Sequence, residues 1–525
     1  MNMNCGITKR FTFEELKLYN DGRKWQKTYR IGLWSIGRVA GCMRVVSCSI
    51  IIGILFAIIQ GAQGGLINNQ EYRMTSSLRS SKSGEVNLAT YLEFSQKVRL
   101  KDREVRVWDA AFCRALNDSD KVYVPDRGEP YYISQTIVLK SGKSLRLDPK
   151  AEIRAMPWMQ TMLLRNATPL PGNQLPEPQS IPPDHNIRVS GGIWNAARNE
   201  NPKSLCCYDL EDSITGMSGA LEFTNVRDLT VSDLEIRNAG NFCIQLSNAQ
   251  KVEISGITFR DSKADGLHMN GPLKNLRVHH LVNEGTGDDF VALNAWDWVH
   301  AHVTAGPIED VILEHCECRS GYNSIRMLSG VKHYFDGTTR DCFIRNVIIR
   351  DLHGVQNFKM YAQGLSGTQE KLQVGKLEKI YFKDIFGLKK LNRIPFDPPY
   401  YGQKDRTAPF EILANSDDLV FENLHGDFDF SENPVVVAVG PLAFTWSREG
   451  EDPFFAKELF PAHLSCVVKN LTIGPVFGRN GVRAKDPSQL VKAFKLVPRP
   501  DFVPGKYESR GGTGSGRILN LIANP

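Results

Sequence analysis

Residues 254–281 read ISGITFRDSKADGLHMNGPLKNLRVHHL, and this stretch decides the fold because it contains one short pattern twice. Ile254-Ser255-Gly256-Ile257 opens it, and Val278-His279-His280-Leu281 closes it 24 residues later. In both copies two aliphatic residues flank a polar residue and a residue drawn from Asp, Asn, Gly or His. A repeat at an interval of roughly 20 to 50 residues is typical of a unit that stacks on copies of itself.

The pattern occurs six more times in the second half of the chain. These copies are Val231–Leu234, Leu313–Cys316, Ile344–Val347, Phe382–Ile385, Phe421–Leu424 and Val468–Leu471. The intervals between successive copies are 23, 24, 35, 31, 38, 39 and 47 residues, as expected for a fixed rung with loop insertions of different size. No amphipathic helix of ten or more residues separates them, which argues against a βαβ fold.

We therefore predict an all-β protein, a right-handed parallel β-helix over residues 185–476. The last aliphatic position of each copy should then stack in one interior column. The residues of that column are Leu234, Ile257, Leu281, Cys316, Val347, Ile385, Leu424 and Leu471.

The regions on either side of the repeats have their own signatures. Residues 65–184 should form an N-terminal cap and the first coils, with a helix at 108–116 over the first rung and short strands at 122–125, 131–133, 137–139, 145–147 and 152–153. Six prolines predict a loop over 168–183. Residues 477–525 lose the repeat and read as a C-terminal tail, with the linker-like GGTGSG at 511–516.

Residues 1–64 read as a targeting segment. The apolar run 45–59 follows Arg44, is short for a membrane span, and precedes Ala62-Gln63-Gly64, a plausible cleavage site. Met43 would begin a complete signal peptide, so residues 43–64 are the predicted signal and the mature chain should start near Gly65. A single N-terminal anchor helix is the alternative. We expect a secreted or periplasmic protein without stable membrane association after cleavage.

The charge balance limits the possible partners. Residues 1–64 hold nine of the 64 Lys and Arg and three of the 58 Asp and Glu, which leaves 55 of each. A neutral mature chain gives no reason to expect nucleic acid as a partner. We expect a monomer that binds a polysaccharide substrate.

Eight of the 11 cysteines follow residue 64. Cys316 and Cys318 lie on one strand face, and Cys342 follows Cys318 by about one coil. This spacing predicts a buried stack or a Cys318–Cys342 bridge. It does not favour a metal site, since no CxxC pair or His-rich spacing completes a ligand set.

Three carboxylates fall within the repeats, at Asp265 and at Gly287-Asp288-Asp289. Asp265 and Asp288 are 23 residues apart, the shortest coil, so they should stack on neighbouring rungs with Asp289 beside them. Inverting glycosidic cleavage requires one protonated carboxyl group and a second carboxylate that activates water. Mutual repulsion among three acids can supply both states. The alternative is that each Asp only terminates a turn.

These motifs resemble those of glycoside hydrolase family 28, the polygalacturonase-like, pectin-degrading β-helix proteins. The likeness covers roughly residues 105–475 and includes Val122–Pro125, Val189–Trp194, Asp265-Gly266 and Gly287-Asp288-Asp289. It implies a hydrolase in which Asp288 is the general acid, while Asp265 and Asp289 hold and deprotonate the water.

The chain also departs from the family pattern. The Asn of the family's Asn-Thr-Asp is replaced in Lys263-Ala264-Asp265. The family's Gly-His-Gly falls at Gly321-Tyr322-Asn323, so Tyr322 occupies the histidine position, and Arg-Ile-Lys aligns loosely with Lys359-Met360-Tyr361. These changes weaken the expectation that polygalacturonic acid itself is the substrate.

Other side chains are candidates for substrate binding, each with an alternative structural role. His268 follows Asp265 and faces either the groove or the core, while Arg326 and Lys359 carry charges suited to an anionic sugar but common on surfaces. Trp296 and Trp298 either stack on sugar rings or cover the helix edge. Tyr322 and Tyr361 complete the candidate set.

No cofactor and no metal are expected, because His279 and His280 should point to opposite faces of their strand. Two rival functions remain open. A polysaccharide lyase or epimerase of the same fold would use the three acids as Ca²⁺ ligands. A non-catalytic carbohydrate-binding protein would use them only to shape a groove.

Overall fold

The computed structural model describes residues 84–157, 159, 162–168, 181–200, 219–297, 304–320, 324–333, 339–354, 357–363, 365–366, 373–389, 408–440, 466–493 and 516–524. All of them belong to one compact unit, Arg79–Pro525. The predicted targeting segment at 1–64 lies outside the described residues, as do Cys206, Cys207, Trp298 and Tyr322. Among the residues that are described, no helix has the length and apolarity needed to cross a membrane.

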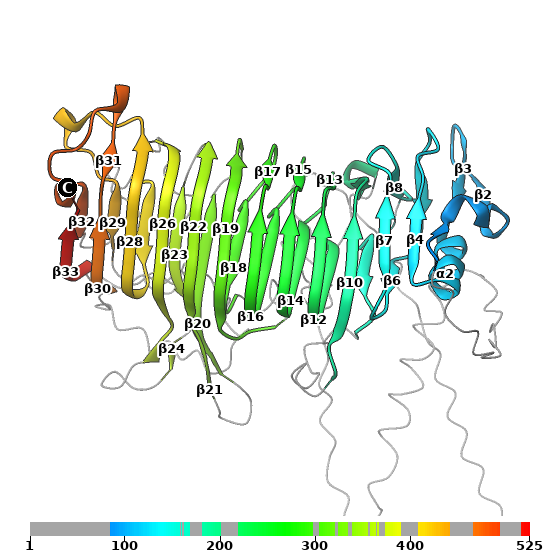
Figure 1. Ribbon diagram of the computed structural model, residues 1–525, viewed down its shortest axis with the longest axis horizontal. Helices are drawn as coiled ribbons and strands as arrows, with labels where there is room; N and C mark the ends of the chain where they lie inside the picture. The colour runs from blue at the N-terminus through cyan, green and yellow to red at the C-terminus, as the bar shows by residue number, and fades with distance from the viewer. Residues whose placement is uncertain are drawn as a thin grey trace, which may run out of the picture. The chain divides into compact units, whose positions relative to one another are not determined.

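Long strands that pair in parallel with the next one along the chain build the unit (Figure 1). Each long strand lies in parallel register with its partners one rung before and one rung after, apart from one-residue shifts such as the one after Ser247. The predicted fold class, an all-β right-handed parallel β-helix, is confirmed. The long strands are β12 (Gly219–Ser232), β14 (Phe242–Ser255), β16 (Leu267–His279), β19 (Ile308–Cys318), β22 (Ile344–Gly354), β26 (Lys376–Leu388), β28 (Asn415–Gly426) and β30 (Cys466–Ile473).

Two series of shorter strands complete the coils. One series follows the long strands and comprises β11 (Ile193–Asn195), β13 (Glu235–Arg237), β15 (Thr258–Arg260), β17 (Val282–Asn283) and β31 (Val476–Phe477). The other comprises β18 (Val291–Asn294), β20 (Ile325–His333), β23 (Phe358–Gln363), β27 (Phe410–Leu413), β29 (Val437–Val439) and β32 (Val491–Ala493), which pair in parallel from β18 to β32. Additional hairpin strands are β21 (Thr339–Cys342), β24 (Leu365–Ser366) and β25 (Gln373–Val374).

A left-handed backbone corner explains the third position of the sequence pattern. Asp233, His280 and His315 have φ values of 55°, and Gly256 has a φ of 63°. Gly, Asn and Asp adopt this region most readily, and His is also enriched there. A second left-handed corner lies five residues before each of these, for example at Asp228. Each coil therefore contains the same short pattern at two corners.

The existence of two corners corrects the predicted interior column. Cys316 pairs with Leu352, and Val347 instead stacks on Val311 in the neighbouring column. Leu424 likewise pairs with Val476, whereas Leu471 stacks on Leu419. In these two coils the sequence pattern lies at the earlier of the two corners, as at Asn346, which precedes the corner at Asp351. All eight predicted residues are nevertheless buried in the core.

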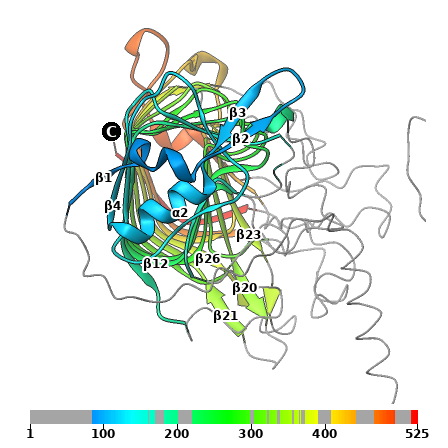
Figure 2. The same ribbon diagram turned by 90° about the vertical axis from the view of Figure 1, so that its right-hand side faces the viewer.

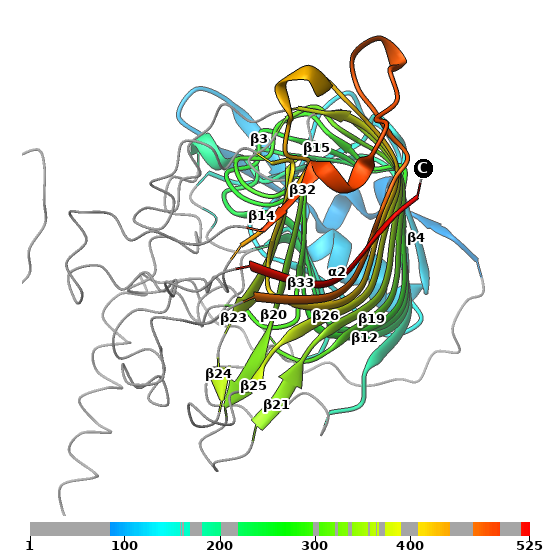
Figure 3. The same cartoon turned by 90° about the vertical axis from the view of Figure 1, so that its left-hand side faces the viewer.

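The coils extend beyond residues 185–476 in both directions. β4 (Lys121–Val124), β7 (Ser144–Leu147) and β10 (Asp184–Ser190) pair in parallel in turn. At the other end β33 (Gly516–Ala523) pairs along β30 (Figure 3). The remaining N-terminal strands are β1 (Val86–Asn87), β2 (Gln96–Arg99), β3 (Glu104–Val107), β5 (Tyr131–Ile133), β6 (Ile137–Leu139), β8 (Glu152–Ala155) and β9 (Leu164–Asn166).

The first rung is covered by the helix that the sequence predicted. α2 (Asp109–Asp118) crosses the N-terminal end of the stack (Figure 2) and buries Ala111, Phe112, Ala115 and Leu116 in the core. Short 3₁₀ turns lie at Leu88–Phe94, Arg198–Glu200, Phe430–Glu432, Arg479–Gly481 and Pro487–Leu490.

One expectation about side chains is wrong. His279 and His280 do not point apart: their Nδ1 atoms are 2.7 Å from each other, because the left-handed corner at His280 interrupts the strand alternation. Of the two alternatives for the cysteines, the bridge is absent and the buried arrangement is present, since Cys318 and Cys342 are free thiols in the core.

Candidate active site

Asp265 and Asp289 occupy the same position on adjacent rungs. Asp265 lies two residues before β16 and Asp289 two residues before β18, and Leu267 pairs with Val291, 24 residues later. The backbone N–H of Asp289 donates to Asp265 Oδ1 at 3.1 Å. The predicted stack of Asp265 on Asp288 is therefore off by one residue, because this coil has 24 residues and not 23.

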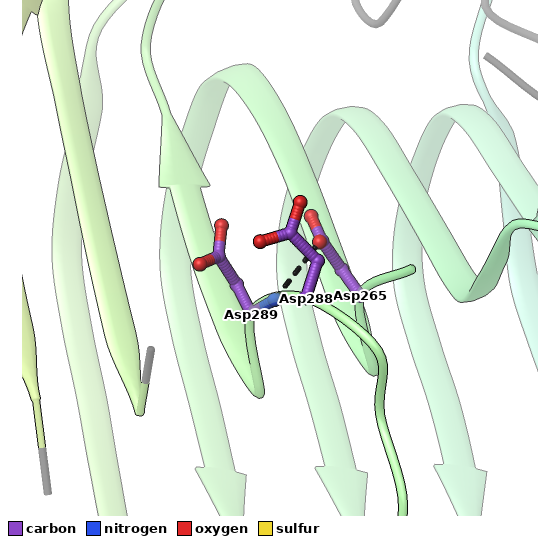
Figure 4. A group of neighbouring side chains, drawn as sticks. All are labelled: Asp265, Asp288 and Asp289. Carbon is purple, nitrogen blue, oxygen red and sulfur yellow. Dashed lines mark hydrogen bonds between the residues drawn. The ribbon is translucent and has the colours of Figure 1, made fainter. Parts of the chain in front are cut away.

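Asp288 nevertheless joins the other two acids. One carboxylate oxygen from each of Asp265, Asp288 and Asp289 lies within 4.8 Å of the others, and the three carboxylates point to the same side of their turns (Figure 4). Asp265 and Asp289 are buried, with 1% and 0% exposed, whereas Asp288 is half-buried. Gly287 allows this packing, because a Cβ there would lie 2.2 Å from the carbonyl oxygen of Lys263. The structure thus brings the three predicted catalytic acids into one cluster.

Arg326 on β20 is the positive partner of this cluster. Its Nε lies 2.9 Å from Asp289 Oδ2, and its Nη2 lies 3.7 Å from Asp265 Oδ2 and 3.5 Å from Asp297 Oδ2. Only 6% of Arg326 is exposed. Burial alone would lower the pKa of this guanidinium, but Asp289, Asp297 and Asp265 raise it well above its ordinary value. Arg326 is therefore engaged with site carboxylates and is not a surface cation.

The pKa of the Asp265 carboxyl group is set mainly by burial and not by its positive neighbour. Burial raises its pKa well above the ordinary value, and the charge of Asp288 adds to this effect. Arg326 and the backbone N–H of Asp289 lower the pKa without overcoming the burial. A raised pKa in a cluster of acids is a common property of catalytic carboxyl groups.

His268 is buried inside the site, so the prediction that it contacts substrate directly is wrong. Its Nδ1 lies 2.6 Å from Asp265 Oδ2, its Nε2 lies 3.3 Å from Asp297 Oδ2, and none of its side chain is exposed. Its ring stacks on Phe242 with 3.8 Å between centroids. An imidazole enclosed in this way acts on other protein groups.

The other predicted binding residues are placed differently. Lys359 on β23 is buried, with 2% exposed, and pairs in register with Arg326 one rung earlier. Trp296 is buried, with 7% exposed, and packs into the core. Tyr322 and the side chain of Tyr361 lie outside the described part of the chain.

Three functional side chains escaped prediction: Asp297, Asn270 and Asn294. The amide of Asn294 donates to Asp297 Oδ2 at 2.7 Å, and the amide nitrogens of Asn270 and Asn294 each lie 3.3 Å from His268 Nε2. The two asparagines pair in register on adjacent rungs. Their 24-residue spacing was visible in the sequence and could have indicated them, but nothing in the sequence pattern linked Asp297 to His268.

No family model matches the sequence, and no curated protein matches it. Solved structures do match. An exopolygalacturonase from Thermotoga maritima is 13% identical, with 85% of this chain and 92% of that chain covered and a TM-score of 0.46. A family 28 exopolygalacturonase from Yersinia enterocolitica is 13% identical, with 84% and 78% covered and a TM-score of 0.45. PfbA, a surface adhesin of Streptococcus pneumoniae, is 11% identical, with 84% and 91% covered and a TM-score of 0.44.

Two of these three proteins are of the class that the sequence motifs resemble, and the third is an adhesin. At such identities and TM-scores they assign no activity to this chain. The function has to be argued from the geometry of the site.

Proposed function

We propose that this protein is a secreted or periplasmic glycoside hydrolase that cleaves a polysaccharide by acid/base hydrolysis. The observation that carries the proposal is the cluster of Asp265, Asp288 and Asp289, whose carboxylate oxygens lie within 4.8 Å of one another. Pectin-like and other uronic-acid-containing polysaccharides are the first substrates to test.

The unequal burial of the three acids supports a division of roles. Asp288 is half-buried and can reach the glycosidic oxygen of a bound chain, so we assign it as the general acid. Asp265 and Asp289 are buried. A small water molecule can reach these carboxylates more easily than the anomeric carbon of a sugar can. We assign them to hold and deprotonate that water. Attack by water, without a covalent glycosyl intermediate, gives inversion at the anomeric carbon, whereas carboxylates within 4.8 Å are closer to the spacing of retaining enzymes than to the roughly 6.5 to 9.5 Å of inverting ones, so the anomer released is the deciding measurement.

A calcium-dependent lyase or epimerase is the second candidate, because the same oxygens are close enough together to hold a cation. The ion pair between Arg326 Nε and Asp289 Oδ2 favours the hydrolase. It already places a positive charge beside one of the three carboxylates. A lyase would need Ca²⁺ and would release an unsaturated product that absorbs ultraviolet light.

The experiment is to incubate the purified mature chain with uronic-acid-containing and neutral polysaccharides and to measure new reducing ends. We expect reducing ends with at least one polysaccharide, in EDTA as well as in Ca²⁺, and the inverted anomer as the first product seen by ¹H NMR. Asp288→Asn is the matched control and should release them about 10² to 10⁴-fold more slowly. Binding without cleavage in both proteins would show a carbohydrate-binding protein and not an enzyme.

A further inference from the structure

His268 on β16 faces away from the core yet is fully buried. Asp265 lies at its Nδ1, at 2.6 Å, and Asp297 at its Nε2, at 3.3 Å. Phe242 stacks on the ring with an angle of 12° between the planes. The imidazole is therefore held at both ring nitrogens and on one face, which leaves it little freedom to turn.

Ala292 provides the room for this arrangement. In the row of outward-facing positions His268 is followed by Ala292 on the next rung and by Arg326 on the rung after that. Two rungs span about 10 Å, and Arg326 reaches back across Ala292 to lie 3.7 Å from Asp265 and 3.5 Å from Asp297. A larger side chain at position 292 would separate the guanidinium from both carboxylates.

The same contacts fix the carboxylate of Asp265. Its Oδ1 accepts from the backbone N–H of Asp289 at 3.1 Å, and its Oδ2 lies 2.6 Å from His268 Nδ1. With a partner on each oxygen, rotation of the carboxylate would break one contact or the other. A donor on the carboxylate also favours its charged form, the form that can accept a proton from water.

We propose that Asp297, Asn294, His268 and Asp265 form a positioning relay, in which the Nδ1–H of His268 donates to Asp265 and keeps it turned toward the attacking water, while the amide of Asn294, bound to Asp297, donates to the other ring nitrogen. This inference rests on the proposed function and deepens it. His268 is a positioning residue and not a catalytic one, because it is buried and acts through Asp265. Its loss should lower kcat and leave KM nearly unchanged.

The charged groups around the ring come from several elements. Asp265 precedes β16, Asp297 follows β18, and Arg326 projects from β20. The carboxylates of Asp288 and Asp289 have an oxygen within 4.8 Å of the carboxylate of Asp265, which contacts the ring. On the rung before, the row position is Gln245, which does not titrate. A change in the pH profile on altering His268 is therefore expected to report on the carboxylates that His268 contacts.

The test compares two amides. In His268→Asn the amide nitrogen takes the place of Nδ1 and can still donate to Asp265, whereas His268→Gln places its amide near the Nε2 position. We expect His268→Gln to lower kcat by about 10²-fold, as misplacement of a reacting group does. The acid limb of its kcat/KM profile should move to higher pH, because Asp265 loses a donor that favours its charged form. His268→Asn should keep most of the rate and the wild-type limb.

Phe242→Leu is the matched control, because it removes the stacking contact and leaves the donor. It should lower the melting temperature without moving the acid limb. Equal acid limbs in His268→Gln and the wild-type protein, with hydrolysis intact, would overturn the relay while leaving the proposed function standing. A wild-type protein that cleaves nothing would instead reject the proposed function.

A readout without turnover covers the case in which the wild-type protein cleaves nothing. In ¹⁵N-histidine NMR spectra the Nδ1–H signal of His268 is the one lost in His268→Asn. It should move in Asp265→Asn, because the acceptor changes from a carboxylate to an amide. A signal that stays in place would overturn the relay whatever the activity.

Discussion

Two groups of charges, each built around a buried carboxylate, lie on the same coils and differ in their ratio of carboxylates to arginines. At Glu314 one carboxylate, with 1% of its side chain exposed, lies between Arg277 at 2.9 Å and Arg350 at 2.5 Å, two arginines on adjacent rungs. At the candidate site one guanidinium, that of Arg326, lies within 4 Å of three buried carboxylates.

The pKa values follow this balance. Burial would raise the pKa of Glu314, but hydrogen bonds from Arg350 and Arg277 hold it below the ordinary value. Burial raises the pKa of Asp265 and Arg326 does not reverse it. A carboxylate with matched donors stabilises the fold, whereas a buried carboxyl group whose pKa stays raised is costly and is retained where chemistry needs it.

The largest expected effect tests whether Asp265 and Asp289 of the candidate site act together. Asp265→Asn and Asp289→Asn should each lower hydrolysis about 10² to 10⁴-fold, since acid or base groups contribute that much. If the two hold one water, the double variant should cost far less than the product of the single losses. Initial rates of reducing-end release measure this. Fully multiplicative losses would mean that the two carboxylates act separately.

Removal of the shared cation comes next in size. Arg326→Leu leaves three buried carboxylates without their common partner, so unfolding should become easier by about 3 to 5 kcal/mol, the usual result of breaking a buried ion pair. Arg326→Lys is the control, because it keeps the positive charge but loses the planar set of guanidinium N–H donors. Urea denaturation gives the free energy of unfolding. An unchanged stability in Arg326→Leu would contradict the placement of the guanidinium among the acids.

For Glu314, which lies between Arg277 and Arg350, we expect a smaller effect on stability and none on activity. Glu314→Gln should cost about 1.5 to 3 kcal/mol, the range for hydrogen bonds to charged groups. Because the folded pKa of Glu314 is lowered, its contribution is present above the ordinary glutamate pKa and is lost as the pH falls through the folded value. The stability gap between wild-type and Glu314→Gln protein should therefore close in acid. A gap that persists at low pH would refute this origin.

These two groups also show what the sequence could and could not reveal. The fold was readable because left-handed corners require Asp, Asn, Gly or His next to buried aliphatics, as at Asp233 and His280. The column assignment failed at Val347 because two corners per coil carry the same local pattern. The acids were identifiable from their spacing, although a coil of 24 residues moved the stack from Asp288 to Asp289.

The contacts of the site depend on long side chains that cross rungs, which local sequence does not encode. Arg326 bends across Ala292 to reach acids from other turns, and Asp297 meets His268 from the far end of β18. Only the folded register brings these residues together. The burial of Arg326 and Trp296 was not visible in the sequence for the same reason.

The smallest effect concerns the core thiols. Burial raises the pKa of Cys243 and Cys316 to about 12, so neither should react with iodoacetamide at pH 8 in the native protein, whereas exposed Cys113 should. Peptide mass spectrometry after alkylation without a reductant reads out each site. The same map should show Cys318 and Cys342 as unlinked thiols once the chain is denatured. A Cys318–Cys342 linked peptide would contradict the structure.

The most direct test of the account measures hydrolysis and melting temperature together in Asp288→Asn and Glu314→Gln. Asp288 is half-buried and serves chemistry, so its amide variant should lose about 10² to 10⁴-fold in rate and melt close to the wild-type temperature. Glu314 serves the fold, so its amide variant should melt at a lower temperature and hydrolyse at the wild-type rate below that transition. A folded Asp288→Asn protein with unchanged hydrolysis would contradict the assignment of the acid cluster as the active site.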